Sequence, residues 1–379
     1  MAGALDRGKL AGLTDCENLE QLDYLSLQSS IRSDPKIGSN LPKGYFRQDP
    51  RSKERILYSQ ARARRPVTRE GEALTLPPEE GVENCPLCQG ETTSFIDVAP
   101  LSSGHTLINK NLYPVLYPGG EGAPSFEQFS DLSSGRAKGL HFLQWVSTEH
   151  DKELHKIPLS DALMVLDRLS CLERFLLHES GDSMPSTIEF EEEEHFGYST
   201  IIKNYGFGAG GSLSHPHQQI VHANVMPLSI AWDLQFKRDR GLSFARFLQE
   251  NNDSKLDVFE IGPAKVVVPY FMHRPLHSII LIGYKDRQGD LSYLHHLDSE
   301  EAEALVISIR KVMTVLIDLM PRMGRLPCFN VLFHCGPIGR MYVEICAHTQ
   351  ERAGLEHMGL SVCQGLAEDS ARFLREAML

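Results

Sequence analysis

The sequence predicts an α+β fold made of two similar halves, each an antiparallel sheet with a long helix packed on it, joined into one extended sheet. Short apolar runs typical of strands flank two long amphipathic helices, which we expect at 159–180 and 298–320. The order of strands, long helix and strands occurs twice, with a period of roughly 150 residues. Proline-punctuated turns at 111–118 and 266–275 occupy corresponding places in the two halves.

We expect three parts along the chain: an N-terminal extension at 1–45, an N-terminal half at 46–227 and a C-terminal half at 228–379. The extension contains a weakly periodic segment, 19–32, that predicts a short helix. A strand at 56–59 follows, and the densest basic cluster of the chain comes directly after it. A loop rich in proline and glycine, 76–91, holds Cys85 and Cys88.

Further strands of the N-terminal half are expected around 105–110, 141–148 and 199–204, and another is expected to include His215 and to end before Pro227. Ser160 is the expected N-cap of the helix at 159–180. The acidic run at 189–194 indicates a solvated loop or hairpin. In the C-terminal half we expect a helix at 232–252 and three strands within 257–285. The helix at 298–320 has acids at its N-terminal end, as the helix dipole favours. Strands at 329–335 and 341–348 and a helix at 355–378 close the chain.

Composition excludes several classes of protein. The 379 residues carry a formal net charge of -12, from 38 Lys and Arg against 50 Asp and Glu. This balance argues against the broad basic surface of a nucleic-acid binder. No segment approaches the ~20 apolar residues that cross a bilayer, so we expect no membrane span. The start of the chain has no apolar core of a secretory signal, and eight cysteines are too sparse for a disulfide scaffold. We therefore expect a cytoplasmic protein.

The most informative feature is His215-Pro216-His217-Gln218-Gln219. On a strand, His215, His217 and Gln219 share one face. An imidazole whose other nitrogen is held by an acceptor can attack phosphorus, and a neighbouring amide can donate to a phosphoryl oxygen. His217 and Gln219 suit these two roles, and the glycine-rich stretch at 206–211 can cradle phosphate. A structural polar ladder or an edge strand is the alternative interpretation.

Cys85 and Cys88 have the spacing of a tetrahedral zinc site. Two thiolates require two further ligands, for which His215 is a natural third and His150, at the end of a strand, a fourth. Two free core thiols and a redox pair are the alternatives.

The motifs QARARRP, CPLCQG, NLYP, STEH, GGSLSHPHQQ and ANVMP occur in the order found in the galactose-1-phosphate uridylyltransferase family, which is part of the histidine-triad superfamily. The resemblance covers most of the chain from the first of these motifs onward, including both halves. SHPHQQ lies between the uridylyltransferase pattern, in which Gly precedes the final Gln, and that of ADP-glucose phosphorylases, in which Ser stands beside the first His.

The resemblance implies two histidine-triad-like halves and a ping-pong reaction. In this reaction His217 becomes covalently nucleotidylated by a nucleotide sugar and passes the nucleotide to a sugar 1-phosphate, while Gln219 stabilises the phosphoryl oxygens. It also implies Zn²⁺ bound by the set Cys85, Cys88, His150 and His215. Substrate contacts are implied for Arg62, Arg65, Asn111, Asn204 and Ser212.

The family often has a second metal site, which corresponds here to Asp233, His334, Cys346 and His348. Asp replaces Glu and Cys replaces His at two of these positions, so the site either binds a different metal or has been lost. The family commonly forms homodimers with the active site near the subunit boundary.

Three alternatives to the uridylyltransferase-type reaction remain. The first is a phosphorylase acting on an ADP-glucose-type nucleotide sugar or a diadenosine polyphosphate, with inorganic phosphate as acceptor. The second, a hydrolase of the histidine-triad type, is disfavoured because Gln219 stands where those enzymes have a third histidine. The third is a non-catalytic, zinc-stabilised nucleotide-binding protein, which would have no need of His217.

Overall fold

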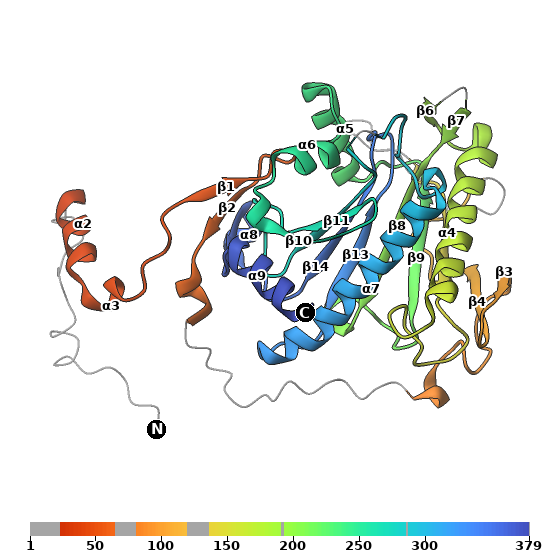
Figure 1. The fold of residues 1–379 in the computed structure, drawn as a ribbon, viewed down its shortest axis with the longest axis horizontal. Helices are drawn as coiled ribbons and strands as arrows, with labels where there is room; N and C mark the ends of the chain where they lie inside the picture. Colours follow the sequence, from red (N-terminus) through yellow and green to blue (C-terminus); the bar gives the residue numbers. More distant parts are fainter. Residues whose placement is uncertain (1–22, 65–80, 120–135, 191–192, 286, 379) are drawn as a thin grey trace.

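The computed structural model describes residues 23–64, 81–119, 136–190, 193–285 and 287–378. Its centre is one ten-stranded antiparallel sheet, covered on one face by two long helices (Figure 1). The predicted α+β class and the single extended sheet are confirmed.

Each half of the chain contributes five strands to this sheet. The N-terminal five are β3 (Phe95–Pro100), β4 (His105–Lys110), β5 (Gly139–Trp145), β8 (Tyr198–Tyr205) and β9 (His217–Ala223). The C-terminal five are β10 (Asp257–Ile261), β11 (Ala264–Val267), β12 (Ser278–Ile282), β13 (Phe329–His334) and β14 (Tyr342–Ala347). From edge to centre the orders are β3-β4-β5-β9-β8 and β10-β11-β12-β14-β13, so both halves have the same connectivity. The division at residue 227 stays a prediction.

The long helices α4 (Leu159–Glu179) and α7 (Ser299–Arg322) occupy equivalent places, after the third strand of each half. Asp298 caps α7 in a capping box, since its carboxylate accepts from the Glu301 N–H at 2.8 Å. The prediction of Ser160 as the N-cap of α4 is wrong. The Pro158 carbonyl already accepts the Ala162 N–H at 3.0 Å, so the helix begins earlier and Ser160 is its second residue.

Two other predicted helices are interrupted. The segment 232–252 forms α5 (Leu228–Arg240) and α6 (Phe244–Asn251), because Gly241 takes a left-handed conformation with φ of 71° and ends the first helix. The segment 355–378 forms α8 (Gly354–His357), β15 (Leu360–Cys363) and α9 (Ala367–Ala377). β15 pairs in parallel with β2 (Arg55–Tyr58), about three hundred residues earlier, and local periodicity carries no signal of such a pairing.

The remaining elements lie around this frame. β1 (Phe46–Gln48) pairs with β2, and β6 (Ser186–Phe190) pairs with β7 (Glu193–Phe196), which makes the acidic run part of a hairpin. In the extension, α2 (Tyr24–Ser33) and α3 (Pro35–Gly38) bury no residue and project away from the sheet (Figure 1). In the described parts of the chain no helix combines the length and apolarity of a membrane span.

The two faces of the sheet differ, and this difference positions the site. On β5, Gln144 points to the helical face, where its Nε2 group donates to the Val165 carbonyl of α4 at 2.8 Å. Leu143 and Trp145 therefore point to the opposite face, where they form a small apolar cluster separate from the main core. His217 pairs with Trp145 and Gln219 pairs with Leu143, so both lie on this second face.

Candidate active site

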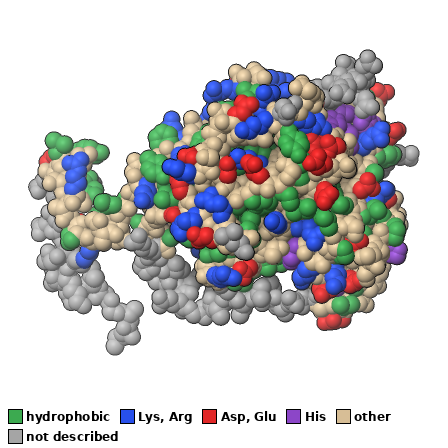
Figure 2. All heavy atoms as spheres, viewed as in Figure 1, with side chains coloured by type: hydrophobic (Ala, Val, Ile, Leu, Met, Phe, Trp, Pro, Cys, Tyr) green, Lys and Arg blue, Asp and Glu red, His purple; other side chains and the backbone are tan. Residues whose placement is uncertain are grey.

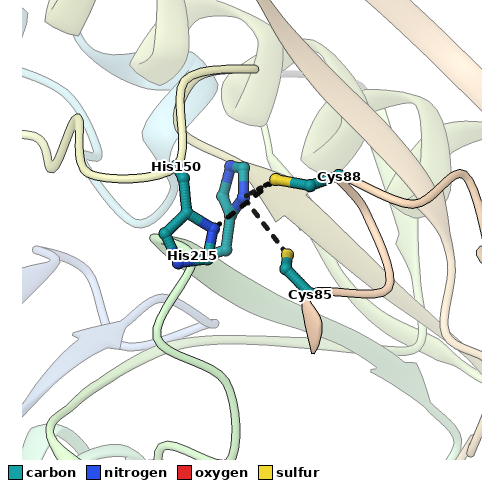
Figure 3. A group of neighbouring side chains, drawn as sticks. All are labelled: Cys85, Cys88, His150 and His215. Carbon is teal, nitrogen blue, oxygen red and sulfur yellow. Dashed lines mark hydrogen bonds between the residues drawn. The ribbon is translucent and has the colours of Figure 1, made fainter. Parts of the chain in front are cut away.

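The structure brings Cys85, Cys88, His150 and His215 together, and their side chains point toward one another (Figure 3). The Nδ1 atom of His215 lies 3.5 Å from both sulfur atoms, and the Nδ1 atom of His150 lies 3.5 Å from Cys88 Sγ. Four tetrahedral ligands about 2.2 Å from a metal ion would lie about 3.6 Å from one another. The spacing and the donor types are therefore compatible with a bound metal ion.

Neighbouring groups orient this cluster. The Nε2–H group of His215 donates to the Ser147 carbonyl at 2.8 Å, which leaves the Nδ1 lone pair facing the thiols. The Nε2 atom of His150 lies 3.1 Å from the Ser214 hydroxyl. Burial and the adjacent Cys85 raise the pKa of the Cys88 thiol to about 11. A metal ion bound here would supply the positive charge that favours ionisation of Cys88.

His217 is the first residue of β9, and its ring is held in one tautomer. Its Nδ1–H group donates to the His215 carbonyl at 2.9 Å, so the Nε2 atom carries the lone pair. Burial lowers the pKa of His217 to about 4, and the nearby ammonium group of Lys203 contributes to the decrease. Its ring lies 5.4 Å from that of Trp145. A neutral imidazole with a fixed lone pair has the chemistry of a nucleophile.

A buried ion pair supports the backbone beside this ring. The Lys203 ammonium lies 2.8 Å from the Glu153 carboxylate, and it donates to the His217 carbonyl at 3.1 Å. Both charged side chains are less than a tenth exposed. The pair therefore ties β8 and the segment before α4 to the first residue of β9.

The side chain of Gln219 is oriented by His141, a residue that the sequence interpretation did not single out. The Val115 N–H donates to Nδ1 of His141 at 3.2 Å, so the proton of the neutral ring lies on Nε2. That Nε2 atom lies 3.1 Å from Oε1 of Gln219. Because the amide oxygen of Gln219 accepts this bond, its NH₂ group is left to donate. The sequence contained one sign of this role: the alternation of side chains along β5 places His141 on the same face as Trp145.

The predicted nucleotide contacts Asn111 and Asn204 lie near the strand ends. The amide nitrogen of Asn111 lies 3.1 Å from His141 Nε2, which brings Asn111 close to Gln219. Asn204 binds the glycine-rich loop instead, since its Nδ2 group donates to the Gly210 carbonyl at 3.4 Å. Asn330 donates to both Asn204, at 2.8 Å, and the Ala209 carbonyl, at 2.9 Å. These bonds fix the loop at the end of β8.

The other predicted substrate contacts are more scattered. Ser212 is exposed between the glycine-rich loop and His215. Arg62 lies in a 3-10 turn, Gln60–Arg64, which Figure 1 shows on the opposite side of the molecule from β9. Arg65 lies outside the described residues.

The four residues predicted for a second metal do not converge on one point. His334 Nδ1 lies 3.4 Å from the Asp233 carboxylate, and its Nε2 atom lies 2.8 Å from Glu344. Cys346 Sγ lies 3.6 Å from Glu344 as well. His348 lies elsewhere, with its Nε2 atom 2.6 Å from the Asn330 side chain.

Glu344 is thus the centre of this second group, and the sequence interpretation missed it. Its other oxygen lies 2.7 Å from His277 Nε2. Burial alone would raise the pKa of Glu344, but His277 and His334 hold it well below its usual range. Arg51 lies 3.6 Å from Asp233, so protein cations compensate both buried carboxylates. Residues His277, Glu344 and Cys346 have ligand atoms close enough to share an ion.

Comparison with known proteins finds relatives that cover most of the chain. No family profile matches the chain. The chain is 21% identical over 350 residues to an ADP-glucose phosphorylase of Arabidopsis thaliana, covering 88% of this chain and 93% of that protein. A solved structure of an ADP-glucose phosphorylase from Arabidopsis thaliana with bound ADP-glucose has a TM-score of 0.66 at 19% identity, covering 88% of this chain and 98% of that one.

A solved uridylyltransferase has a TM-score of 0.62 at 21% identity, again covering 88% of this chain and 98% of that one. The relatives are thus a phosphorylase and a uridylyltransferase, in agreement with the expected nucleotide-transferring enzyme. The predicted resemblance is confirmed: over most of its length the chain is similar to the galactose-1-phosphate uridylyltransferase family with its ADP-glucose phosphorylase-like members, and it has their fold.

Proposed function

We propose that this protein is a nucleotidyltransferase that moves a nucleoside monophosphate from a nucleotide sugar to a phosphate-bearing acceptor through a covalent intermediate on His217. The observation that carries the proposal is the tautomer of His217. The bond from its Nδ1–H group to the His215 carbonyl leaves the lone pair on Nε2, which can act as a nucleophile.

In the first half-reaction Nε2 attacks the α-phosphorus of the nucleotide sugar. A nitrogen–phosphorus bond forms, the bond to the bridging oxygen breaks, and the sugar 1-phosphate leaves with the electron pair. The Gln219 NH₂ group donates to a non-bridging oxygen as negative charge develops there. In the second half-reaction an acceptor phosphate oxygen attacks the same phosphorus and releases neutral His217.

The acceptor defines the reaction class. A sugar 1-phosphate acceptor yields a new nucleotide sugar, whereas inorganic phosphate yields a nucleoside diphosphate. The similarity to an ADP-glucose phosphorylase over 93% of that protein favours phosphate. Ser214 beside His215 agrees with this choice, because the resemblance places Ser there in the phosphorylases.

We propose that Zn²⁺ is held by Cys85, Cys88, His150 and His215. Two thiols and two imidazoles at this spacing suit tetrahedral zinc, which would fix His215 and with it the carbonyl that orients His217. A cytosolic location agrees with thiols that must stay reduced. For the second group, centred on Glu344, we propose no metal, because protein cations already compensate its carboxylates.

We propose a homodimer as the working form. Within one chain Arg62 lies across the molecule from β9, so it can serve as a phosphate contact only for a His217 of another subunit (Figure 1). The α2 and α3 arm buries nothing in its own chain and exposes Tyr24 and Leu25, as expected of a segment that packs on a second copy.

The direct test is trapping of the covalent intermediate. The protein is incubated with ADP-glucose, UDP-glucose or a GDP-sugar labelled at the α-phosphate, and label retained on denatured protein is measured. We expect retention with one of these donors and its release by inorganic phosphate or by hexose 1-phosphate. His217→Gly should retain no label while keeping its fold and about one zinc at Cys85 and Cys88. Full turnover by this variant would overturn the mechanism.

A further inference from the structure

Three histidines far from His217 converge where the two halves of the chain meet. His178 lies near the end of α4, His195 lies in β7, and His295 lies in the 3-10 turn Leu294–His296 that precedes α7. Ligand nitrogens of the three rings all lie within 4.8 Å of one another. Figure 2 shows histidine side chains gathered at the upper right of this face, in the region of β6 and β7.

The rings meet in T-shaped contacts. The planes of His178 and His195 are 86° apart with centroids 4.7 Å apart, and those of His195 and His295 are 82° apart with centroids 5.5 Å apart. The three rings are therefore not stacked in parallel, and one ligand nitrogen of each lies within 4.8 Å of the other two.

A buried carboxylate fixes the orientation of one ring. Glu173 of α4 is fully buried, and its Oε2 atom lies 2.9 Å from Nδ1 of His295 and accepts the His295 backbone N–H at 3.2 Å. The His295 side chain is 7% exposed. The carboxylate therefore holds the proton on Nδ1 and turns Nε2 toward the other two rings.

The other nitrogen of His295 has no partner among the described residues. If His295 is cationic, its buried Nε2–H donor is unsatisfied. If it is neutral, the negative charge of Glu173 has no counter-charge at hand. A cation bound at Nε2 resolves both deficits, because it accepts the lone pair and compensates the carboxylate through the ring.

We propose that His178, His195 and His295 bind a divalent transition metal ion, with Zn²⁺ as the natural occupant. Imidazole is a preferred ligand of such ions, and an imidazole backed by a carboxylate is the usual arrangement around protein-bound zinc. Three protein ligands leave one tetrahedral position for water.

The proposed ion has a structural consequence. It would join α4 of the N-terminal half, the β6–β7 hairpin and the turn before α7 of the C-terminal half. It would thus hold together segments that lie far apart in the sequence and that meet only after most of the chain has been synthesised. The inference does not depend on the nucleotidyl chemistry of His217, and activity is not its readout.

The test separates this ion from the one at the thiols. In a Cys85→Ser/Cys88→Ser background, the full-length protein is stripped with a chelator, incubated with Zn²⁺ and desalted, and its metal content is measured. We expect about one zinc per chain, lost on His295→Ala. Cobalt substitution provides a second readout, because the remaining site should give d–d bands without thiolate-to-metal charge transfer.

Two further variants keep the result interpretable. Glu173→Gln keeps the three ligands but removes the charge, and it should weaken zinc binding by about 10- to 100-fold. His155→Ala, a half-buried histidine outside the cluster, should leave the metal content unchanged. The proposal is overturned if the Cys85→Ser/Cys88→Ser protein binds no zinc, or if a folded His295→Ala variant binds as much as its parent.

Discussion

The Nε2–H group of His141 donates a hydrogen bond of 3.1 Å to the side-chain oxygen of Gln219. This bond selects one of the two amide orientations of Gln219, the one in which the NH₂ group is free to meet a phosphoryl oxygen. In the proposed reaction His141 would therefore be a positioning residue, because it would act through Gln219.

Replacement of His141 by Phe should lower kcat by about 10- to 100-fold, somewhat less than the loss of an oxyanion donor itself. KM should change little, since the ground state does not depend on the same bond. His141→Gln, which can still donate to Oε1, should recover part of the rate. Steady-state kinetics of the three proteins test this. Equal kcat for wild type and His141→Phe would show that Gln219 needs no such partner.

Gly206→Ala should displace the glycine-rich loop. Gly206 has φ of +81°, and an added Cβ would lie 2.6 Å from the Pro327 carbonyl oxygen. Gly210→Ala is the comparison variant, because Gly210 lies in the left-handed region with φ of 85° and ψ of 14°, and the nearest atom to an added Cβ lies 3.6 Å away. It should carry only the cost of a left-handed residue, about 1–2 kcal/mol. Gly206 has ψ of 153°, in a region that essentially only glycine adopts, so Gly206→Ala should carry a larger backbone cost as well as the clash. Urea denaturation and the KM for the nucleotide sugar should both rank it as the worse variant, and identical values would contradict the packing.

Lys203→Met should destabilise the fold by about 3–5 kcal/mol, because it leaves Glu153 as an unpaired buried charge. The double variant Lys203→Met/Glu153→Leu should recover much of this loss in stability. Its kcat should stay low, because the ammonium bond to the His217 carbonyl is still missing. As a control, Arg246→Ala breaks an exposed pair with Glu250 and should cost under about 1 kcal/mol. Chemical denaturation gives these values, and a Lys203→Met cost no larger than the control would refute the role of the pair.

His222 should make the protein sensitive to acid. Burial lowers the pKa of His222, although a bond of 2.7 Å to the Phe196 carbonyl opposes the shift. Its folded-state pKa lies below that of the unfolded chain, about 6.5. Below that pH the unfolded chain binds a proton that the folded chain does not, so stability falls by up to about 1.4 kcal/mol per pH unit.

The variant His222→Gln should therefore show a shallower decrease in the free energy of unfolding between neutral pH and pH of about 5. His105→Gln, at an exposed position, serves as the control. Urea titrations at a series of pH values measure the slopes. If the free energy of unfolding of His222→Gln has the same slope against pH as that of wild type, His222 does not contribute to the acid sensitivity.

The periodicity of apolar residues predicted the helices and strands whose formation depends on residues close together in the sequence. The strands of the large sheet other than β3, and the helices α4 and α7, were predicted from alternating or helical apolar patterns. The spacing of Cys85 and Cys88 suggested a metal loop directly. The sequence also suggested His215 and His150 as further ligands, and the structure brings them to the two thiols from a turn after β5 and from the bend before β9.

What the sequence did not show depends on distant partners. β15 forms because it pairs with the distant strand β2. A four-residue run between two helical segments gives no sign of such a distant partner. His141 matters only through the residue opposite it on the next strand. His348 shares a strand neighbourhood with Cys346, yet its side chain binds Asn330 rather than the carboxylate at Glu344. Side-chain direction at a strand end is set by tertiary contacts and not by spacing.

The central pairing of the large sheet joins β8 to β13, the equivalent strands of the two halves, and it is antiparallel. Equivalent edges paired in this way are related by a local two-fold axis, which is the symmetry of two identical chains meeting edge to edge. A single-half ancestor could thus have completed the same sheet by self-association. In the C-terminal half, β14 carries Glu344 and Cys346 in the place that β9, with His217 and Gln219, occupies in the N-terminal half.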